Sequence, residues 1–153
     1  MVYDPGVGSN GSRLNGSSNT QGDAARMESN RVLGGKAILI VDDDWDVAWS
    51  TAQLVETFGC ITKVVPTAQK ALEHIASGQP IDLIITDIVM PGMSGIEFAR
   101  KVRVGHPELP IVFSTGRDSA VDAVLDAGAV AILKPFEPEV LRRVLVERLQ
   151  PGS

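Results

Sequence analysis

A chain of 153 residues is long enough for one compact domain. Its 19 acidic and 14 basic residues give a formal net charge of −5, so no surplus of basic side chains is available to pair with the phosphates of a nucleic acid. The single cysteine excludes an internal disulfide and suits the cytoplasm, and no apolar run is long enough to cross a membrane.

Residues 1–35 differ in composition from the rest of the chain. They contain seven Gly, five Ser and four Asn but few large apolar side chains. Such a segment cannot bury enough apolar surface to offset the conformational entropy that is lost on folding. We therefore expect a disordered lead over residues 1–35, one domain over residues 36–150 and a short tail over residues 151–153.

Five apolar runs of strand length follow, and they lack the alternation that half-exposed strands show. The runs AILIV, ITKVV, DLIIT, PIVFS and AVAIL occupy residues 37–41, 61–65, 82–86, 110–114 and 129–133. Strands that are apolar on both sides are typical of a parallel sheet covered by helices on both faces. The sequence thus predicts five buried parallel strands.

Segments with helical periodicity separate these runs and follow the last one. Ser94 and Glu97 form a capping box at the start of one such segment, and Asp44 is expected to be the N-cap of the first. The alternation of strands and helices predicts a (βα)5 fold, a doubly wound α/β architecture. The expected helices span residues 47–58, 68–76, 94–104, 118–126 and 137–149.

Polar side chains follow four of the five predicted strands, at the edge of a parallel sheet where ligand sites lie. Carboxylates gathered there repel one another unless a cation neutralises them, and oxygen ligands favour Mg²⁺. With a metal ion bound, Asp87 can act as a nucleophile toward phosphorus, while Lys134 and Thr115 stabilise the transferring group. The residues at this edge are Asp42 and Asp43 after the first strand, Asp87 after the third, Thr115 after the fourth and Lys134 after the fifth.

Four motifs in order resemble the receiver domain of response regulators in bacterial two-component signalling. These motifs are ILIVDDD, LIITDIVMPGMSG, PIVFSTG and ILKPF, and the resemblance covers roughly residues 36–150. It implies a flavodoxin-like sheet with strand order 2-1-3-4-5. The run PIVFSTGR is further similar to a subgroup of stand-alone receivers with a PxxFATGY-like fourth strand.

The resemblance also implies roles for the residues at the sheet edge. Asp42 and Asp43 resemble the metal-binding acids of the family. Asp87 resembles the phosphoacceptor, which contributes to the Mg²⁺ site together with the backbone carbonyl of Val89.

Two further positions match the family pattern on the fourth and fifth strands. Thr115 resembles the switch hydroxyl, and Lys134 resembles the lysine that binds the phosphoryl group. The peptide bond between Lys134 and Pro135 is expected to be cis by the same resemblance.

Three positions modulate the expected behaviour because they depart from the family pattern. Ala131 stands where the family commonly has an aromatic switch residue, three positions before the lysine. Val89 and Arg117 stand two residues after Asp87 and Thr115, at the positions that tune hydrolysis in the family. Val89 cannot orient an attacking water and Arg117 can hold the phosphoryl group, so we expect slow hydrolysis.

The expected function is a phosphorylation-controlled switch. A histidine kinase or histidine phosphotransfer protein donates the phosphoryl group to Asp87, and the altered face around the fourth and fifth strands then binds a downstream protein. Pairing with a second copy of the chain stays open, as does an origin within a larger hybrid protein.

Two other functions remain for comparison. A pseudo-receiver would bind partners without phosphorylation, which the unusual residues Ala131 and Arg117 leave open. A turnover phosphatase of the haloacid dehalogenase type fits poorly, because that chemistry requires Thr or Val two residues beyond its second aspartate, where this chain has Asp46. The expected protein is therefore not a turnover enzyme.

Overall fold

The computed structural model describes residues 24, 27, 30–116 and 129–150. Within these residues, five parallel strands form one sheet in the order β2-β1-β3-β4-β5, which confirms the predicted fold class and strand order. The strands are β1 (Ala37–Val41), β2 (Ile61–Val65), β3 (Leu83–Asp87), β4 (Ile111–Thr115) and β5 (Val130–Leu133). After a helical turn at residues 30–33, the helices in the described ranges are α2 (Trp45–Thr57), α3 (Ala68–Ala76), α4 (Gly95–Gly105) and α6 (Pro138–Leu149). The helix expected over residues 118–126 lies outside the described residues.

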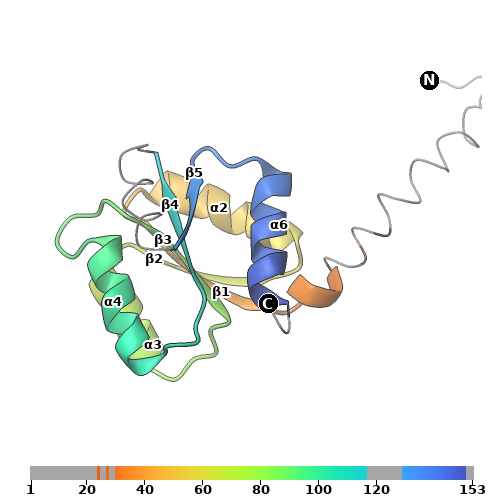
Figure 1. Ribbon diagram of the computed structural model, residues 1–153. Helices are drawn as coiled ribbons and strands as arrows, with labels where there is room; N and C mark the ends of the chain where they lie inside the picture. The colour runs from red at the N-terminus through yellow and green to blue at the C-terminus, as the bar shows by residue number, and fades with distance from the viewer. Residues whose placement is uncertain (1–23, 25–26, 28–29, 117–128, 151–153) are drawn as a thin grey trace, which may run out of the picture.

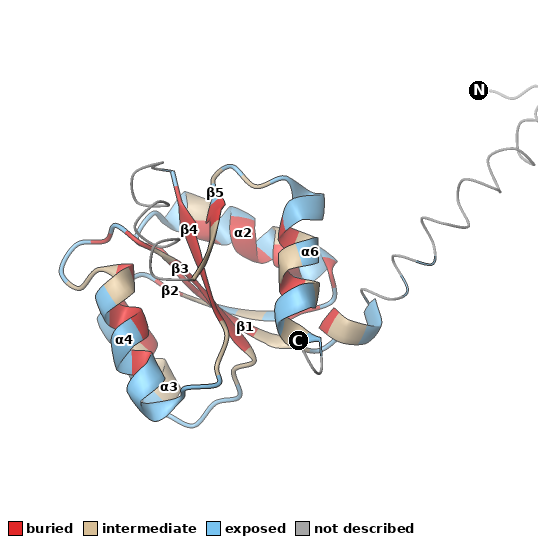
Figure 2. Ribbon diagram, in the orientation of Figure 1, coloured by how far each residue is buried: buried red, intermediate tan, exposed pale blue. Residues whose placement is uncertain are grey.

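The sheet separates two apolar cores. Helices α2 and α6 cover one face, and α3 and α4 cover the other (Figure 1). In β1, Ile38 and Ile40 point into the core beneath α2 and α6, whereas Leu39 and Val41 point into the core beneath α3 and α4. Burial of such a side chain contributes about 1.5–3 kcal/mol, and the central strands are buried along their length (Figure 2). This two-sided burial explains why the sequences of the central strands are mostly apolar, whereas the edge strand β2 (ITKVV) is largely exposed and contains Lys63.

Helix ends follow the predicted capping residues. Asp44 is the N-cap of α2 and accepts a hydrogen bond from the backbone N–H of Val47 at 3.3 Å. Ser94 caps α4 in the same way, accepting from the N–H of Glu97 at 3.2 Å. Pro138 is the first residue of α6, where its missing N–H carries no penalty. None of the helices in the described part of the chain combines the length and apolarity needed to cross a membrane.

Strand β3 begins one residue later than expected because Asp82 makes a different set of contacts. Its backbone N–H donates to the carbonyl of Ala37 at 2.7 Å, and its carboxylate accepts from the N–H of Ala37 at 2.8 Å. Asp82 thereby holds the start of β1 from outside the strand. The strand also ends one residue later than expected, at Asp87, so this carboxylate is carried by the last residue of β3.

The expected disordered lead is wrong for residues 30–35. Residues 30–33 are helical, and Leu33 is fully buried in the core beneath α2 and α6. The N–H of Gly35 donates to the carbonyl of Gly59 at 2.8 Å, and the Cys60 thiol donates to the carbonyl of Leu33 at 3.5 Å. Burial raises the pKa of this thiol to about 11, so Cys60 is a protonated core residue. The prediction was based on the average composition of residues 1–35, which is rich in Gly and Ser and gives no sign that Leu33 is a core residue.

Candidate functional site

Three carboxylates meet at the carboxyl edge of the sheet. Strands β1 and β3 are neighbours, and their register pairs Val41 with Thr86, so Asp42 and Asp87 follow at the same level. Oxygens of Asp42, Asp43 and Asp87 all lie within 4.8 Å of one another. Asp42 is buried, Asp87 is half-buried and Asp43 is exposed. The structure therefore brings together the three acids that the sequence placed at this edge.

Lys134 joins the acids from the end of β5. Its Nζ lies 2.6 Å from Oδ2 of Asp42 and 3.5 Å from Oδ2 of Asp87. Its backbone N–H donates to the carbonyl of Thr115 at 2.9 Å, which fixes the residue beside the end of β4. The peptide bond from Lys134 to Pro135 is cis, as expected. The ammonium is thus held over the acid cluster by both backbone and side-chain contacts.

The donor set suits a hard divalent cation. All side-chain donors in the cluster are carboxylate oxygens, and three carboxylates face the single ammonium of Lys134, so negative charge remains in excess. The second oxygen of Asp42 accepts from the N–H of Asp44 at 3.0 Å, which orients that carboxylate before any ion arrives. Mg²⁺ prefers such oxygen ligands and keeps several waters when one or two carboxylates bind it. The residues present therefore fit this ion.

The carboxyl of Asp87 has a raised pKa in the protein without a metal ion. Burial raises the pKa of its carboxyl above the usual value, and the charge of Asp42 raises it further. The ammonium of Lys134 and the backbone N–H of Ile88, which donates to Oδ1 of Asp87 at 2.7 Å, oppose this increase without cancelling it. The ionised carboxylate is therefore less favourable in this site than in water, and it gains from a nearby cation.

This raised pKa predicts a stability difference that depends on pH. The folded state disfavours the ionised form of Asp87. The stability that protonated Asp87 contributes is therefore fully present below the pKa of the unfolded chain and is lost as the pH rises through the pKa of the folded protein. In EDTA at neutral pH, we expect Asp87→Asn to have a larger free energy of unfolding than the wild type. This difference in unfolding free energy should shrink as the pH falls toward 3.8, the ordinary pKa of an aspartate carboxyl. Urea unfolding across this pH range measures it, and a less stable Asp87→Asn at neutral pH would contradict the assignment.

The remaining predicted residues lie around this cluster or outside the described chain. Thr115 is the last residue of β4 and is buried, next to the backbone of Lys134. Val89 follows β3 with 45% of its surface exposed. Ala131 is half-buried on β5, opposite Phe113 in the register with β4. Arg117 lies outside the described residues.

Gly95 is a functional position that the sequence analysis missed. A Cβ atom on this residue would lie 2.0 Å from the carbonyl oxygen of Asp87 and 2.9 Å from its carbonyl carbon. The N–H of Gly95 donates to the carbonyl of Ile88 at 2.8 Å. Helix α4 thus begins in direct contact with the backbone that carries the Asp87 carboxylate. The only sequence signal was a glycine directly after the N-cap Ser94.

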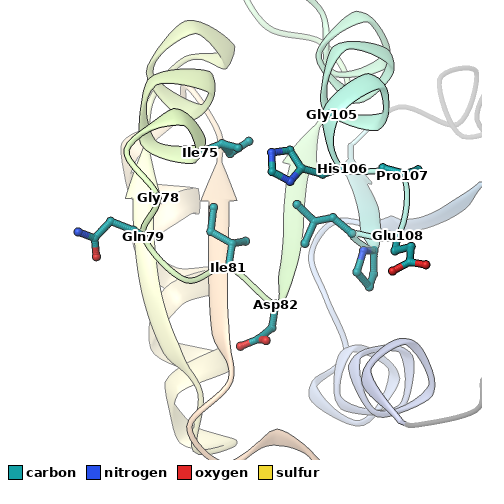
Figure 3. A pocket seen from close by; sticks show the side chains of 11 residues that line it. Ile75, Gly78, Gln79, Ile81, Asp82, Gly105, His106, Pro107 and Glu108 are labelled. Atoms are coloured by element: carbon teal, nitrogen blue, oxygen red, sulfur yellow. The ribbon is translucent and has the colours of Figure 1, made fainter.

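Two of the hollows in the surface lie in different places, one beside Lys134 and one at the amino ends of the strands. One, of about 550 Å³, lies between α2 and the segment after β5 and is lined by Ser50, Leu54 and Lys134, so it opens directly beside the cluster. Another, of about 590 Å³, lies between the end of α3 and the segment before β4, at the amino ends of the strands, with His106 and Glu108 at its rim (Figure 3). Of these two hollows, only the first is lined by a residue of the cluster, Lys134.

Comparisons with known proteins agree with this geometry. A family model described as the response regulator receiver domain matches residues 38–146. Response regulator MprA of Mycolicibacterium vanbaalenii is 38% identical over 122 residues, which cover 76% of this chain and 52% of that protein, so the chain spans about half the length of this curated relative. A CheY-like receiver domain protein from Methanospirillum hungatei superposes with a TM-score of 0.65 at 32% identity, covering 78% of this chain and 100% of that one. Response regulator protein TrrA from Thermotoga maritima, in complex with Mg²⁺-BeF, gives a TM-score of 0.69 at 27% identity, covering 74% and 99%.

Proposed function

Because this chain belongs to the response regulator receiver domain family, we propose that it is a phosphorylation-controlled switch whose phosphoacceptor is Asp87. The observation that supports this most directly is the convergence of Asp42, Asp87 and Lys134 at one sheet edge. In the proposed reaction, a carboxylate oxygen of Asp87 attacks the phosphorus of a phosphohistidine. The phosphorus–nitrogen bond breaks, an acyl phosphate forms, and the released imidazole takes up a proton.

The residues around Asp87 divide the work of this transfer. Asp42, Asp43, Asp87 and the carbonyl of Val89 would hold Mg²⁺, and that ion would neutralise the charge of the incoming phosphoryl group. TrrA, which was solved with Mg²⁺-BeF, supports this choice of ion. Lys134 would bind a phosphoryl oxygen, since its ammonium already lies 3.5 Å from Oδ2 of Asp87. The Thr115 hydroxyl would respond to the bound group from the end of β4.

The donor would be a histidine kinase or a histidine phosphotransfer protein, and it would reach the cluster through the hollow beside Lys134. The downstream partner would be a protein that reads the β4–β5 side of the sheet. The free, buried Cys60 thiol fits a reducing cytoplasm, where we propose that this chain works. Homodimerisation through the same side of the sheet is a compatible arrangement.

One experiment tests the proposal against its competitors. The purified chain is incubated with Mg²⁺ and a small acyl phosphate donor, and its intact mass is measured. A single alkali-labile phosphoryl adduct that requires Mg²⁺ would support the switch. No adduct would favour a phosphorylation-independent binding module, which Ala131 in place of an aromatic switch residue keeps in contention. Repeated donor hydrolysis without an adduct would instead favour a turnover enzyme.

Lys134 offers a prediction that separates metal binding from phosphoryl binding. In the metal-free protein its ammonium neutralises Asp42, so it competes with Mg²⁺ for that carboxylate. We expect Lys134→Met to bind Mg²⁺ at least as tightly as the wild type but to acquire the adduct roughly a hundredfold more slowly, since one stabilising group is lost. Mg²⁺ titration followed by tryptophan emission and adduct kinetics measure the two effects.

The control for this prediction is Lys101→Met, which removes one exposed lysine from α4 and should change neither quantity. Weaker Mg²⁺ binding in Lys134→Met would show that Lys134 does not compete with the ion.

The exposed aliphatic side chain of Val89 predicts a long-lived phosphoryl group. An aliphatic side chain cannot donate or accept a hydrogen bond, so it cannot orient a water molecule for attack on the acyl phosphate. We expect slow decay in the wild type and faster decay in Val89→Asn, as followed by intact mass after removal of the donor. A half-life of only seconds for the wild type with Mg²⁺ would refute this role of Val89 and the contribution proposed for Arg117.

A further inference from the structure

Helix α2 exposes two tryptophans. Trp45 and Trp49 have 55% and 53% of their surfaces exposed, and their rings stack with centroids 6.3 Å apart and an interplanar angle of 20°. The aromatic rings of Phe98 and Phe113, by contrast, are buried in the core. Large exposed aromatic side chains are costly to keep in water and are the residue types that dominate protein contacts. The pair therefore marks an interaction surface.

The chain segment that carries the pair is acidic, although Lys134 lines the hollow beside Asp46. Asp43, Asp44 and Asp46 are exposed at the start of α2, and the helix itself contains no Lys or Arg. Asp46 lies three residues before Trp49, which places the two side chains on neighbouring positions of the helix surface. Asp46 is not one of the three carboxylates that could hold a metal ion. The partner's contact group must therefore be a cation that also tolerates an aromatic face.

We propose that Trp45, Asp46 and Trp49 form a docking surface for an arginine-bearing segment of a partner protein. A guanidinium is planar, so it stacks on an indole ring while it donates paired hydrogen bonds to a carboxylate. A lysine ammonium offers the same charge without the planar contact. Phosphate-rich partners, such as nucleic acids and anionic lipids, are repelled by the surrounding acids. This surface needs no phosphoryl transfer to Asp87, so the proposal stands apart from the proposed function.

A labelled hexa-arginine peptide and a labelled hexa-lysine peptide of equal charge are the probes. Their anisotropy is measured with the full chain in EDTA at low ionic strength. We expect the arginine peptide to bind at least about fivefold more tightly than the lysine peptide. The double variant Trp45→Ala/Trp49→Ala should lose this preference while keeping the binding that net charge provides. Trp45→Phe/Trp49→Phe should keep most of the preference, because the aromatic faces remain.

Matched variants identify the acidic component. Asp46→Asn is expected to weaken binding of the arginine peptide by about threefold, whereas Glu108→Gln, which removes one charge from the hollow before β4 (Figure 3), should not weaken it. Val104→Ala removes an exposed apolar side chain from α4 and should leave the affinity for both peptides unchanged. Adduct formation in the tryptophan variants confirms that they fold.

Three outcomes would overturn the proposal. The first is equal affinity for the two peptides, and the second is an arginine preference that survives in the Trp45→Ala/Trp49→Ala variant. The third is self-association in sedimentation that requires both the tryptophans and the exposed basic residues Arg100, Lys101 and Arg103 of α4, because the surface would then serve a second copy of this chain.

Discussion

Asp87→Asn is expected to prevent formation of the phosphoryl adduct completely. The amide that replaces the carboxylate is a poor nucleophile and cannot form the acyl phosphate, although its oxygen can still accept the hydrogen bond from Ile88. The variant also removes one of the three carboxylates that would hold Mg²⁺. Intact mass after incubation with Mg²⁺ and a small phosphodonor should show only the unmodified chain.

The matched control for this prediction is Asp44→Asn. Asp44 is next to the acid cluster in the sequence but serves as the N-cap of α2, a role that asparagine performs as well as aspartate. We expect this variant to acquire the adduct at nearly the wild-type rate. An adduct of equal stoichiometry in Asp87→Asn would move the phosphoacceptor to another residue and would refute the proposed mechanism.

Gly95→Ala should damage both the fold and the site. The new methyl group would lie 2.0 Å from the carbonyl oxygen of Asp87, so either α4 or the end of β3 must move. Forced displacement of well-packed backbone typically costs about 1–3 kcal/mol of unfolding free energy. Displacement of the Asp87 backbone by about 1 Å would also slow adduct formation by roughly a hundredfold. Urea unfolding and adduct kinetics measure the two effects independently.

Gly105→Ala provides the control within the same helix. A Cβ atom on Gly105 would meet no heavy atom within 4 Å, and its backbone is that of an ordinary helical residue. We expect this variant to be unchanged or stabilised by about 0.5–1 kcal/mol, because alanine loses less conformational entropy than glycine when a helix forms. If Gly95→Ala behaved like Gly105→Ala, the contact between α4 and Asp87 would have no influence on the site.

The fold was predictable from the sequence because the three central strands β1, β3 and β4 are buried along almost their whole length and therefore read as apolar runs. The bounds of β1 and β2 agree with the prediction, although β2, at the edge of the sheet, is largely exposed. The start of β3 was not predictable, because Asp82 contributes its contacts to β1 from another part of the chain. Leu33 was missed for a related reason: its burial involves Cys60 and other core residues far along the chain, which the local composition does not reveal.

The positions of the acids at the candidate site were predictable from topology alone. The carboxyl ends of parallel strands lie at one edge, which places Asp42 and Asp87 on neighbouring strands and Lys134 at the same edge, two strands from β3. The contacts between individual side chains depend on packing that the sequence pattern does not encode. Pattern alone could not show that Lys134 lies closer to Asp42 than to Asp87, that Gly95 touches the Asp87 backbone, or that two tryptophans stack outside the core.

The ion pair between Asp42 and Lys134 joins residues that are 92 positions apart, and this spacing has a consequence for synthesis of the protein. A ribosome releases the chain from its amino terminus, so all three carboxylates emerge before the lysine does. A nascent or prematurely terminated chain would therefore carry the acids without the ammonium that balances them. The balanced cluster of acids and ammonium is thus restricted to polypeptides whose translation has proceeded past the last strand.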